Sequence, residues 1–336
     1  MKLFRIEEND ANQRLDKFLK KLFPNATRSL IYKINRKDKV KIKFDGSEWK
    51  FKKRDNEYKL QVLDEIKIFL SDKEFEELTS SQPSPDKERE QDQKTKFDKK
   101  DIVFEDGDLL VVNKNSWINV HPWDYKTKES NLIYQIQDYL WDKLNSLTFK
   151  PSLIHRIDRD TSWILMIAKK KDILTRLVLD FKNHNKVKKT YYAIVLWKLS
   201  RREWTITKKL KRIENAKNQN KVQVSESGQT AISHYKLLKE HILETKEWNL
   251  IISELEVNIE TWRMHQIRVH LASIWNPILW DKAYWDKKIN SFLKNNYWLK
   301  RQALHAWKIE FFHYWRNKLI KLEARIKEDL KKFINN

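Results

Sequence analysis

Two arginines and two aspartates alternate in the segment HRIDRD, residues 155–160, shortly before the apolar run at residues 164–168. Positive neighbours favour the ionised form of a carboxylate, so this loop could hold Asp158 as a reactive group between Arg156 and Arg159. The same loop could be a surface ion-pair network, in which an exposed pair contributes about 0 to 1 kcal/mol. Taken alone, the segment does not separate these two interpretations.

Two other segments combine side chains that can stack, bind or move protons. Residues 189–193, KTYYA, open a strand-like run with adjacent tyrosines, whose rings would point to opposite faces of a sheet. Residues 263–270, RMHQIRVH, follow another strand-like run and place Arg263, Gln266 and His270 at helical spacing. Each segment also has an ordinary interpretation, since most such tyrosines only pack and the second segment could be a polar helix start.

The composition limits which chemistry these residues can perform. The chain has no cysteine, which excludes a thiolate nucleophile, a disulfide and cysteine-ligated zinc. Its nine histidines show no HExxH-like spacing. Catalysis must therefore rest on Asp, Glu, Tyr, His, Lys or Arg, and we expect no metal site.

The charge balance points to a polyanionic partner. The chain carries 69 Lys and Arg against 47 Asp and Glu, a formal net charge of +22, which favours nucleic acid first and an anionic membrane surface second. No apolar run approaches the roughly 20 residues of a membrane-spanning helix. The start, MKLFRIEENDANQ, has no apolar stretch of the signal-peptide kind, so we expect a cytoplasmic protein without a membrane partner.

The elements around the three segments predict an α+β domain over residues 101–330. Strand-like runs alternate with helical patterns, as expected for a mostly antiparallel sheet with helices on it. The predicted strands are residues 108–113, 191–196, 249–260, 308–314 and 318–324, and the predicted helices are 129–144 and 172–184.

Residues 12–70 predict a small basic α+β module. Apolar residues recur at helical spacing from Leu15 to Phe23, and Thr27 is the expected N-cap of a second helix. A strand at residues 40–44 should lead to a turn at Asp45-Gly46. The exposed cations Arg28, Lys33 and Arg36 lie on the second helix, and further cations lie on the first. This clustering favours RNA binding over a merely solvated basic face.

Residues 71–100 separate the two regions and contain few apolar side chains. Such a segment cannot bury enough surface to offset the entropy lost on ordering. We therefore predict a flexible, charged linker.

Taken together, HRIDRDTS, KTYYAIV and RMHQIRVHL resemble the RluA family of pseudouridine synthases, whose patterns run close to HRLDxxTSG, KxYxAxV and TGRxHQIRxH. The N-terminal module is similar to the S4-like RNA-binding domain of members that act on large-subunit ribosomal RNA. The arrangement is most similar to the RluC/RluD branch. The resemblance implies a pseudouridine synthase fold, with a central, mostly antiparallel sheet and an active-site cleft.

The resemblance also implies roles for individual residues. Asp158 would be the catalytic aspartate, with Arg268 paired to it across the cleft. Tyr191 would pack on the flipped base and could take the proton from C5. Arg156 would fill the space that the base leaves. The residues expected to contact RNA are His155, Arg156, Arg159, Arg263, His265 and Gln266, together with Arg28, Lys33 and Arg36 in the N-terminal module.

The resemblance predicts an isomerase that needs no metal or organic cofactor. Its expected substrate is uridine in large-subunit (23S) ribosomal RNA or a pre-ribosomal particle, and we expect a monomer. Two alternatives stay open from the sequence: a transfer-RNA pseudouridine synthase, and an RNA-binding or ribosome-assembly protein without catalysis.

Tryptophan replaces glycine at many positions of the family pattern. The chain has 15 Trp and only 3 Gly, although glycine usually makes up about 7% of a protein. Nine tryptophans fall where the family pattern or a hairpin turn calls for glycine: Trp117, Trp123, Trp163, Trp197, Trp262, Trp275, Trp280, Trp285 and Trp315. Tight turns often need φ > 0, which glycine adopts freely and other residues adopt at a cost of about 1 to 2 kcal/mol.

We therefore hypothesise that the gene comes from a lineage that decodes UGA as glycine, and that these positions were translated as tryptophan. The alternative is that the tryptophans are base-stacking platforms for RNA. Stacking residues should lie on exposed strand or groove faces, whereas these positions recur at turns.

Overall fold

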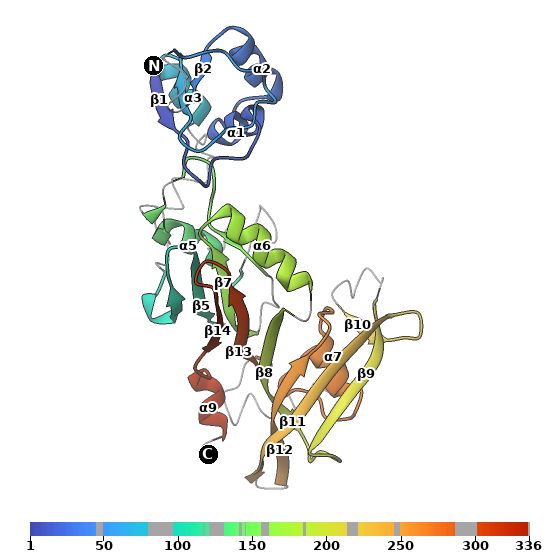
Figure 1. The fold of residues 1–336 in the computed structure, drawn as a ribbon. Helices are drawn as coiled ribbons and strands as arrows, with labels where there is room; N and C mark the ends of the chain where they lie inside the picture. Colours follow the sequence, from blue (N-terminus) through green and yellow to red (C-terminus); the bar gives the residue numbers. More distant parts are fainter. Residues whose placement is uncertain are drawn as a thin grey trace. The chain divides into compact units, whose positions relative to one another are not determined.

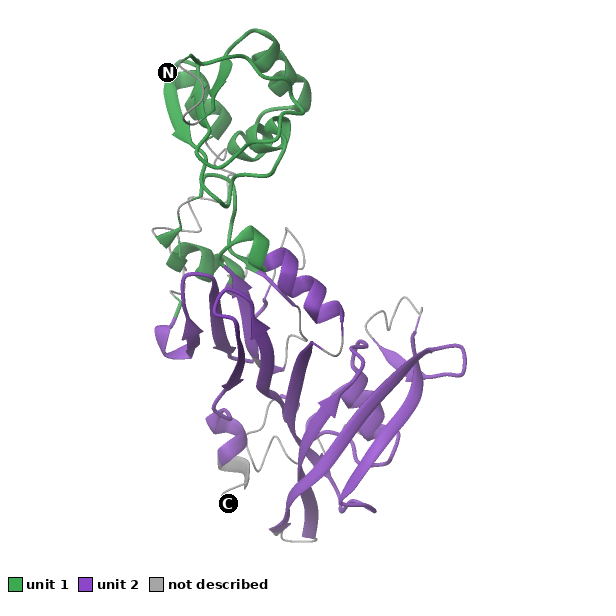
Figure 2. Ribbon diagram, viewed as in Figure 1, with its two compact units in different colours: residues 1–97, 133–152, 169–173 green, residues 98–132, 153–168, 174–336 purple. Residues whose placement is uncertain are grey.

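The computed structural model describes residues 1–44, 50–79, 97–116, 118–120, 131–140, 143–144, 146–155, 161–183, 186–213, 221–244, 249–285 and 301–334. The chain forms two compact units (Figure 2). One comprises residues 1–97, 133–152 and 169–173, and the other comprises residues 98–132, 153–168 and 174–336. The turn predicted at residues 45–46 and the loop predicted at residues 156–160 lie outside the described residues.

The first unit contains the small α+β module. Strands β1 (Lys2–Arg5), β3 (Glu65–Ile68) and β2 (Val40–Lys43) form an antiparallel sheet in that order. Helices α1 (Leu15–Leu22) and α2 (Arg28–Arg36) contribute their apolar faces to the same core as this sheet. Figure 1 shows both helices in one module with β1 and β2. The predicted N-cap is confirmed, because the Thr27 hydroxyl accepts a hydrogen bond from the Leu30 N–H at 3.2 Å.

The linker prediction is wrong at its start. Residues Asp72–Thr79 form helix α3, and Phe75 packs on Phe4 and Phe23 with ring centroids 6.0 and 5.5 Å apart. Ser71 and Glu74 form a capping box, in which each side chain accepts a hydrogen bond from the other residue's N–H. The module therefore extends beyond the predicted limits 12 and 70, with β1 before them and α3 after them. Residues 80–96 of the predicted linker lie outside the described residues.

The second unit is built on an eleven-stranded sheet. Its order is β10-β9-β11-β12-β8-β13-β7-β5-β4, with β14 on β13 and β6 on β7. β13 runs parallel to β7, and the other pairings of known register are antiparallel, so the predicted mostly antiparallel sheet is confirmed. The strands are β4 (Ile102–Glu105), β5 (Leu109–Lys114), β6 (Ser152–Leu153), β7 (Ser162–Ala168), β8 (Val187–Leu196), β9 (Glu203–Arg212), β10 (Val222–Val224), β11 (Gln229–Glu244), β12 (Asn249–Ile259), β13 (Leu304–His313) and β14 (Lys318–Glu323).

Helices lie on this sheet where they bury apolar side chains. Helix α6 (Lys171–Lys182) buries Leu177 and Phe181, and α7 (Gln266–Ala272) packs Val269 into a cluster with residues of β9, β10 and β11. Helix α5 spans Leu132–Leu140, which is shorter than the predicted 129–144, and all of it except Leu132 belongs to the first unit. Helix α9 spans Glu328–Ile334 in the second unit. In the part of the chain that the structure describes, no helix is long and apolar enough to span a membrane.

The backbone supports the glycine hypothesis at three positions. Trp197, Trp275 and Trp280 have φ values of 67°, 65° and 59°, in the left-handed region that glycine enters without strain. The indole N–H groups of Trp280 and Trp285 are buried without a hydrogen-bond partner among the described residues. Trp262, Trp285 and Trp315 do not have positive φ. Trp117, Trp123 and the side chain of Trp163 lie outside what the structure describes.

Candidate active site

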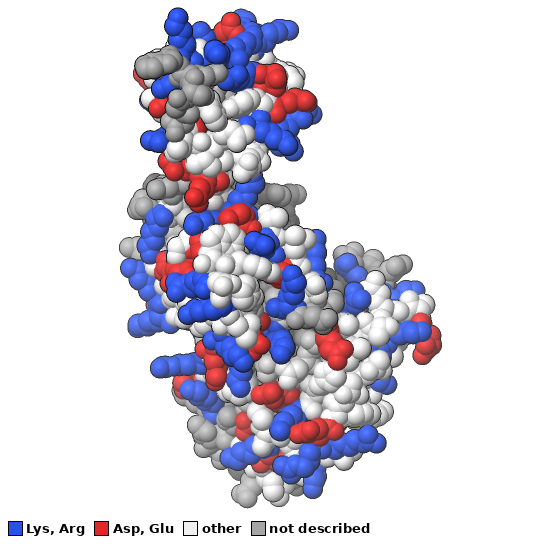
Figure 3. Space-filling view, viewed as in Figure 1, with Lys and Arg blue, Asp and Glu red and all other residues white. Residues whose placement is uncertain are grey.

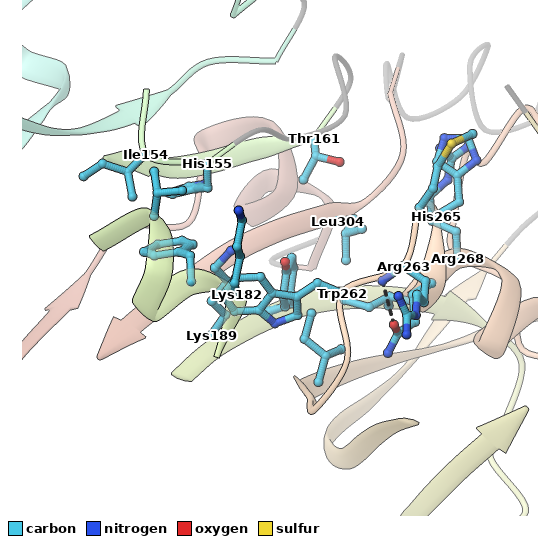
Figure 4. Close-up of a pocket in the computed structure, with 17 residues that line it drawn as sticks. Ile154, His155, Thr161, Lys182, Lys189, Trp262, Arg263, His265, Arg268 and Leu304 are labelled. Atoms are coloured by element: carbon cyan, nitrogen blue, oxygen red, sulfur yellow. Dashed lines mark hydrogen bonds between the residues drawn. The ribbon is translucent and has the colours of Figure 1, made fainter. Parts of the chain in front are cut away.

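Side chains from all three sequence segments line one cleft in the second unit, with a volume of about 420 Å³ (Figure 4). The first segment contributes His155 and Thr161, the second Lys189 and Tyr191, and the third residues 263–268. Figure 4 shows His155 and Lys189 on one side of the cleft and Arg268 on the other, with Trp262 between them. A cleft of this size is in the range of small-ligand sites.

Strand β8 places Lys189 and Tyr191 in the cleft because residues two apart share one face of a strand. Tyr192 points to the other face, where its hydroxyl donates to the Glu254 carboxylate and its ring meets Trp307 edge to face. Burial and Glu254 raise the pKa of the Tyr192 phenol. The prediction that the two rings point to opposite faces is confirmed.

Lys189 is buried beside two aromatic rings. Its Nζ lies 3.7 Å from the ring centroid of Trp262 and 4.4 Å from that of Phe181. Burial holds the pKa of the Lys189 ammonium well below its usual value, because the charged form loses its hydration.

Arg268 enters the cleft from helix α7 and is held by a carboxylate that sequence reasoning missed. Its Nε and Nη2 donate to Oδ2 and Oδ1 of Asp281 at 2.7 and 2.8 Å. The sequence does not show that Asp281, 13 residues further along the chain, pairs with Arg268. The expected pair between Arg268 and Asp158 lies outside the described residues and stays a prediction.

Gln266 fixes the turn that leads into α7. Its carbonyl oxygen accepts from the Arg263 N–H and the Thr261 hydroxyl at 3.0 and 2.9 Å. Its amide donates to the Ile232 carbonyl and the Ser233 hydroxyl at 2.9 and 3.1 Å. The side chain is buried. These bonds give Gln266 a structural role, and its expected RNA contact stays a prediction.

The other two predicted residues of this segment also line the cleft. Arg263 is exposed and donates through Nε to the Thr230 carbonyl at 3.4 Å. His265 stands directly before α7 with a φ of 54°, and its Nδ1 lies 2.7 Å from the Tyr284 hydroxyl.

His155 is the last described residue before the loop predicted at residues 156–160. Its ring stacks on Phe181 with centroids 4.6 Å apart, and its Nε2 accepts from the Met166 N–H at 3.3 Å. Burial, with a smaller contribution from Lys189, holds the pKa of His155 well below its usual value. The ring is therefore neutral, and its packing fixes the chain where the loop begins.

Thr161 and Ser162 fix the chain where the loop ends. The Thr161 hydroxyl accepts from the Gln302 amide at 2.6 Å, and the Ser162 hydroxyl bonds to Nδ1 of His305 at 2.8 Å. All four side chains are buried. Gln302 and His305 were not singled out from the sequence, because their partners lie about 140 residues away. Arg156, Asp158 and Arg159 belong to the loop itself and lie outside the described residues.

The predicted RNA-binding residues of the first unit meet at a second cleft, with a volume of about 1060 Å³. Arg28, Lys33 and Arg36 are exposed and line it together with Lys53 and Arg54. The guanidinium of Arg28 lies 5.6 Å from the Tyr32 ring centroid. Figure 3 shows Lys and Arg spread over the visible face of this unit, with carboxylates among them.

Among the residues that the structure describes, Asp106, Asp108 and His313 lie close enough together to be metal ligands. Arg316 donates to Asp106 Oδ2 at 2.7 Å, and His313 Nε2 lies 3.1 Å from the same oxygen. The Arg316 guanidinium thus already pairs with this carboxylate, and the group does not line the cleft.

Comparisons with known proteins give the context of this cleft. The family described as RNA pseudouridylate synthase matches residues 108–273. The chain is 34% identical over 334 residues to "Ribosomal large subunit pseudouridine synthase C" of Buchnera aphidicola subsp. Baizongia pistaciae, covering 98% of this chain and 96% of that protein. It is 30% identical to the protein of the same name from Vibrio cholerae, covering 97% and 93%. The solved structure titled "Human RNA Pseudouridylate Synthase Domain Containing 4" aligns with a TM-score of 0.55 at 19% identity, covering 70% of this chain and 92% of that chain, and it supports the fold alone.

Proposed function

The chain belongs to the family of RNA pseudouridylate synthases, and from this premise we propose that it converts specific uridines of large-subunit (23S) ribosomal RNA to pseudouridine. As a member of this family it is an isomerase of the RluA type, similar to synthase C. The choice of ribosomal RNA is supported by the names of relatives that match this chain over nearly their whole length.

One observation carries the chemical part of this proposal. Three segments that are far apart in the sequence contribute side chains to a single cleft. His155 and Thr161, which lie on either side of the loop with Asp158, both line it, and so do Tyr191 and Arg268. Asp158 is therefore only three residues along the chain from a cleft-lining residue on either side, His155 and Thr161.

In the proposed reaction Asp158 acts on the uridine. The bond between C1′ and N1 breaks, the uracil turns, and a bond forms between C1′ and C5. The proton leaves C5 and N1 gains one, so the base keeps its composition. Arg268 keeps Asp158 ionised, because a nearby guanidinium favours the charged carboxylate. Tyr191 packs on the base and takes the C5 proton.

A uridine stacked in RNA cannot reach a cleft of this kind, so the nucleotide must be flipped out, which costs a few kcal/mol. We propose that Arg156 fills the space left by the base. Arg263 and His265, which line the cleft just before α7, would bind the RNA backbone next to the flipped nucleotide. His155, Arg159 and Gln266 would support the same contacts, His155 and Gln266 from buried positions.

The first unit would bind RNA beyond the target nucleotide. Arg28, Lys33 and Arg36 share one cleft with Tyr32, which suits phosphates and stacked bases. We propose that this S4-like module recognises large-subunit ribosomal RNA or a pre-ribosomal particle. The protein would work there as a monomer in the cytoplasm.

The test of the chemical proposal is an Asp158→Asn variant assayed on ribosomal RNA, with Asp160→Asn as the matched control in the same loop. Asp158→Asn should lower pseudouridine formation by about 10³-fold or more, since the reacting group is lost. Its RNA affinity should stay within about threefold, and Asp160→Asn should stay active. Activity that survives Asp158→Asn would overturn the assignment.

A further inference from the structure

Arg268 and Asp281 form a bidentate ion pair inside the protein. The two hydrogen bonds, 2.7 and 2.8 Å long, join Nε and Nη2 of the guanidinium to the two carboxylate oxygens. The side chain of Asp281 is 0% exposed and that of Arg268 is 10% exposed. A guanidinium is planar with five N–H donors in a fixed fork, so a carboxylate bound along one edge sets the orientation of the whole plane.

Asp281 is itself held rigidly. Its Oδ1 accepts from the backbone N–H groups of Ala283 and Tyr284 at 2.9 and 3.2 Å. The carboxylate is therefore fixed to the turn that follows Trp280, and it cannot follow Arg268 if the arginine moves.

A second group, the Tyr284 ring, contacts the same guanidinium. Arg268 Cζ lies 5.1 Å from the ring centroid of Tyr284, within the range of a cation–π contact. The Tyr284 hydroxyl lies 2.7 Å from Nδ1 of His265 and accepts from the Val222 N–H at 2.9 Å. The ring is thus fixed to β10 and to the residue before α7.

We propose that Asp281 and Tyr284 are positioning residues for Arg268: the carboxylate sets the edge of the guanidinium and the ring sets its plane, so that the group faces the cleft. The inference rests on the proposed function, in which Arg268 takes part in the reaction. Neither Asp281 nor Tyr284 is among the residues that line the cleft. Asp281 should therefore affect the rate through Arg268, where a displacement of about 1 Å can cost about 100-fold in rate, whereas Tyr284 contacts both Arg268 and His265.

The test is a double-mutant cycle with Asp281→Asn and Arg268→Lys. The readout is tritium release from RNA labelled at C5 of uridine, at saturating and at limiting RNA. Asp281→Asn should lower kcat by about 30- to 100-fold and leave KM within about threefold. In the Arg268→Lys background the same change should lower kcat by no more than about threefold, because the group to be positioned is already altered.

The matched control is Asp106→Asn. Asp106 also accepts from two backbone N–H groups and pairs with an arginine, Arg316, at 2.7 Å. It does not line the cleft. Both Asp→Asn variants should lose thermal stability, and only Asp281→Asn should lose kcat. If Asp281 had only a structural role, the two variants would show the same change in kcat as well as in thermal stability. That result would overturn the proposal.

Two further outcomes are informative. If Arg268→Lys is fully active, the role of Arg268 in the proposed function is wrong, and this inference is wrong with it. If Arg268→Lys is impaired but Asp281→Asn keeps its kcat, or if the two effects add fully, only the positioning proposal is wrong. Should Asp281→Asn fail to fold, Tyr284→Leu removes the ring and leaves the carboxylate in place. That variant should lose kcat at an unchanged KM, and a full kcat would overturn the proposal.

Discussion

At the scale of single residues, the region around the cleft depends on side chains that are neutral because they are buried. His305 is 0% exposed and bonds to Ser162, which follows the loop predicted at residues 156–160. Burial, with a smaller contribution from Arg301, lowers the pKa of His305 to about 4. Since histidine in an unfolded chain has a pKa of about 6.5, the folded protein favours the neutral imidazole.

This difference predicts how stability changes with pH. Above about pH 6.5 the imidazole is neutral in both states, and it does not affect the unfolding free energy. Between about pH 6.5 and pH 4 the unfolded chain binds a proton that the folded chain does not. His305 should therefore lower the unfolding free energy by about 2 kcal/mol between pH 7 and pH 5.

Denaturant unfolding of the natural chain and of His305→Gln at both pH values checks this expectation, since glutamine keeps a polar partner for Ser162 without titrating there. Between pH 7 and pH 5, the unfolding free energy of the unmutated chain should fall by about 2 kcal/mol more than that of the variant. An equal loss in the two proteins would contradict a buried neutral His305.

The sequence allowed some of these residues to be found and not others. Tyr191 and Arg268 were found because each lies within a compact motif, and both line the cleft. Asp281, Gln302 and His305 were missed because they act through partners that only the folded chain brings near. A buried glutamine that bonds to Thr161 has the same local sequence signals as an exposed one.

At the scale of secondary structure, the strongest patterns gave correct elements. β5, β8, β12 and the pair β13–β14 were predicted because apolar and β-branched residues dominate them. β9 and β11 were missed because charged residues fill their exposed positions, as in KKLKR at residues 208–212. Helix α3 was also missed, although Ser71 and Glu74 carry the spacing of a capping box.

The left-handed tryptophans give a prediction at the same scale. Trp275 has a φ of 65° and is 76% exposed, so replacing it with glycine removes strain and little packing. Trp275→Gly should raise the unfolding free energy by about 1 to 2 kcal/mol. Thermal or denaturant unfolding of the two proteins measures this difference.

Trp204→Gly is the control, because Trp204 is also partly exposed but lies inside strand β9. Glycine within a strand should lower stability by about 0.5 to 1 kcal/mol. If both variants were destabilised alike, the strain interpretation would be wrong. The codons give an independent answer: UGG at the nine positions would refute the hypothesis of recoded UGA.

At the scale of the whole chain, the first unit is assembled from separate segments. Asp10 is 0% exposed, and its carboxylate accepts from the Ser146 hydroxyl and from the N–H groups of Leu147 and Thr148. Removing the N-terminal residues would leave residues 146–148 without these bonds. Charge variants are therefore a cleaner test of RNA binding than truncation.

Replacing Arg28, Lys33 and Arg36 together by glutamine should weaken RNA binding and lower the slope of log K against log salt by about 2 to 3, because up to three phosphate contacts are lost. The control replaces Lys41, Lys43 and Lys67 of β2 and β3 by glutamine. This variant loses the same number of positive charges, at positions that do not line the second cleft. Filter binding at several salt concentrations compares the two. Equal slopes in both triple variants would contradict an RNA site on α2.

The central claim is that this chain makes pseudouridine in large-subunit ribosomal RNA. The most direct measurement maps pseudouridines in total RNA from cells with the gene, without it, and with the gene restored. One or more pseudouridines of large-subunit ribosomal RNA should disappear with the gene and return with it. If every such position persists without the gene, or if only transfer RNA loses pseudouridine, the claim is contradicted.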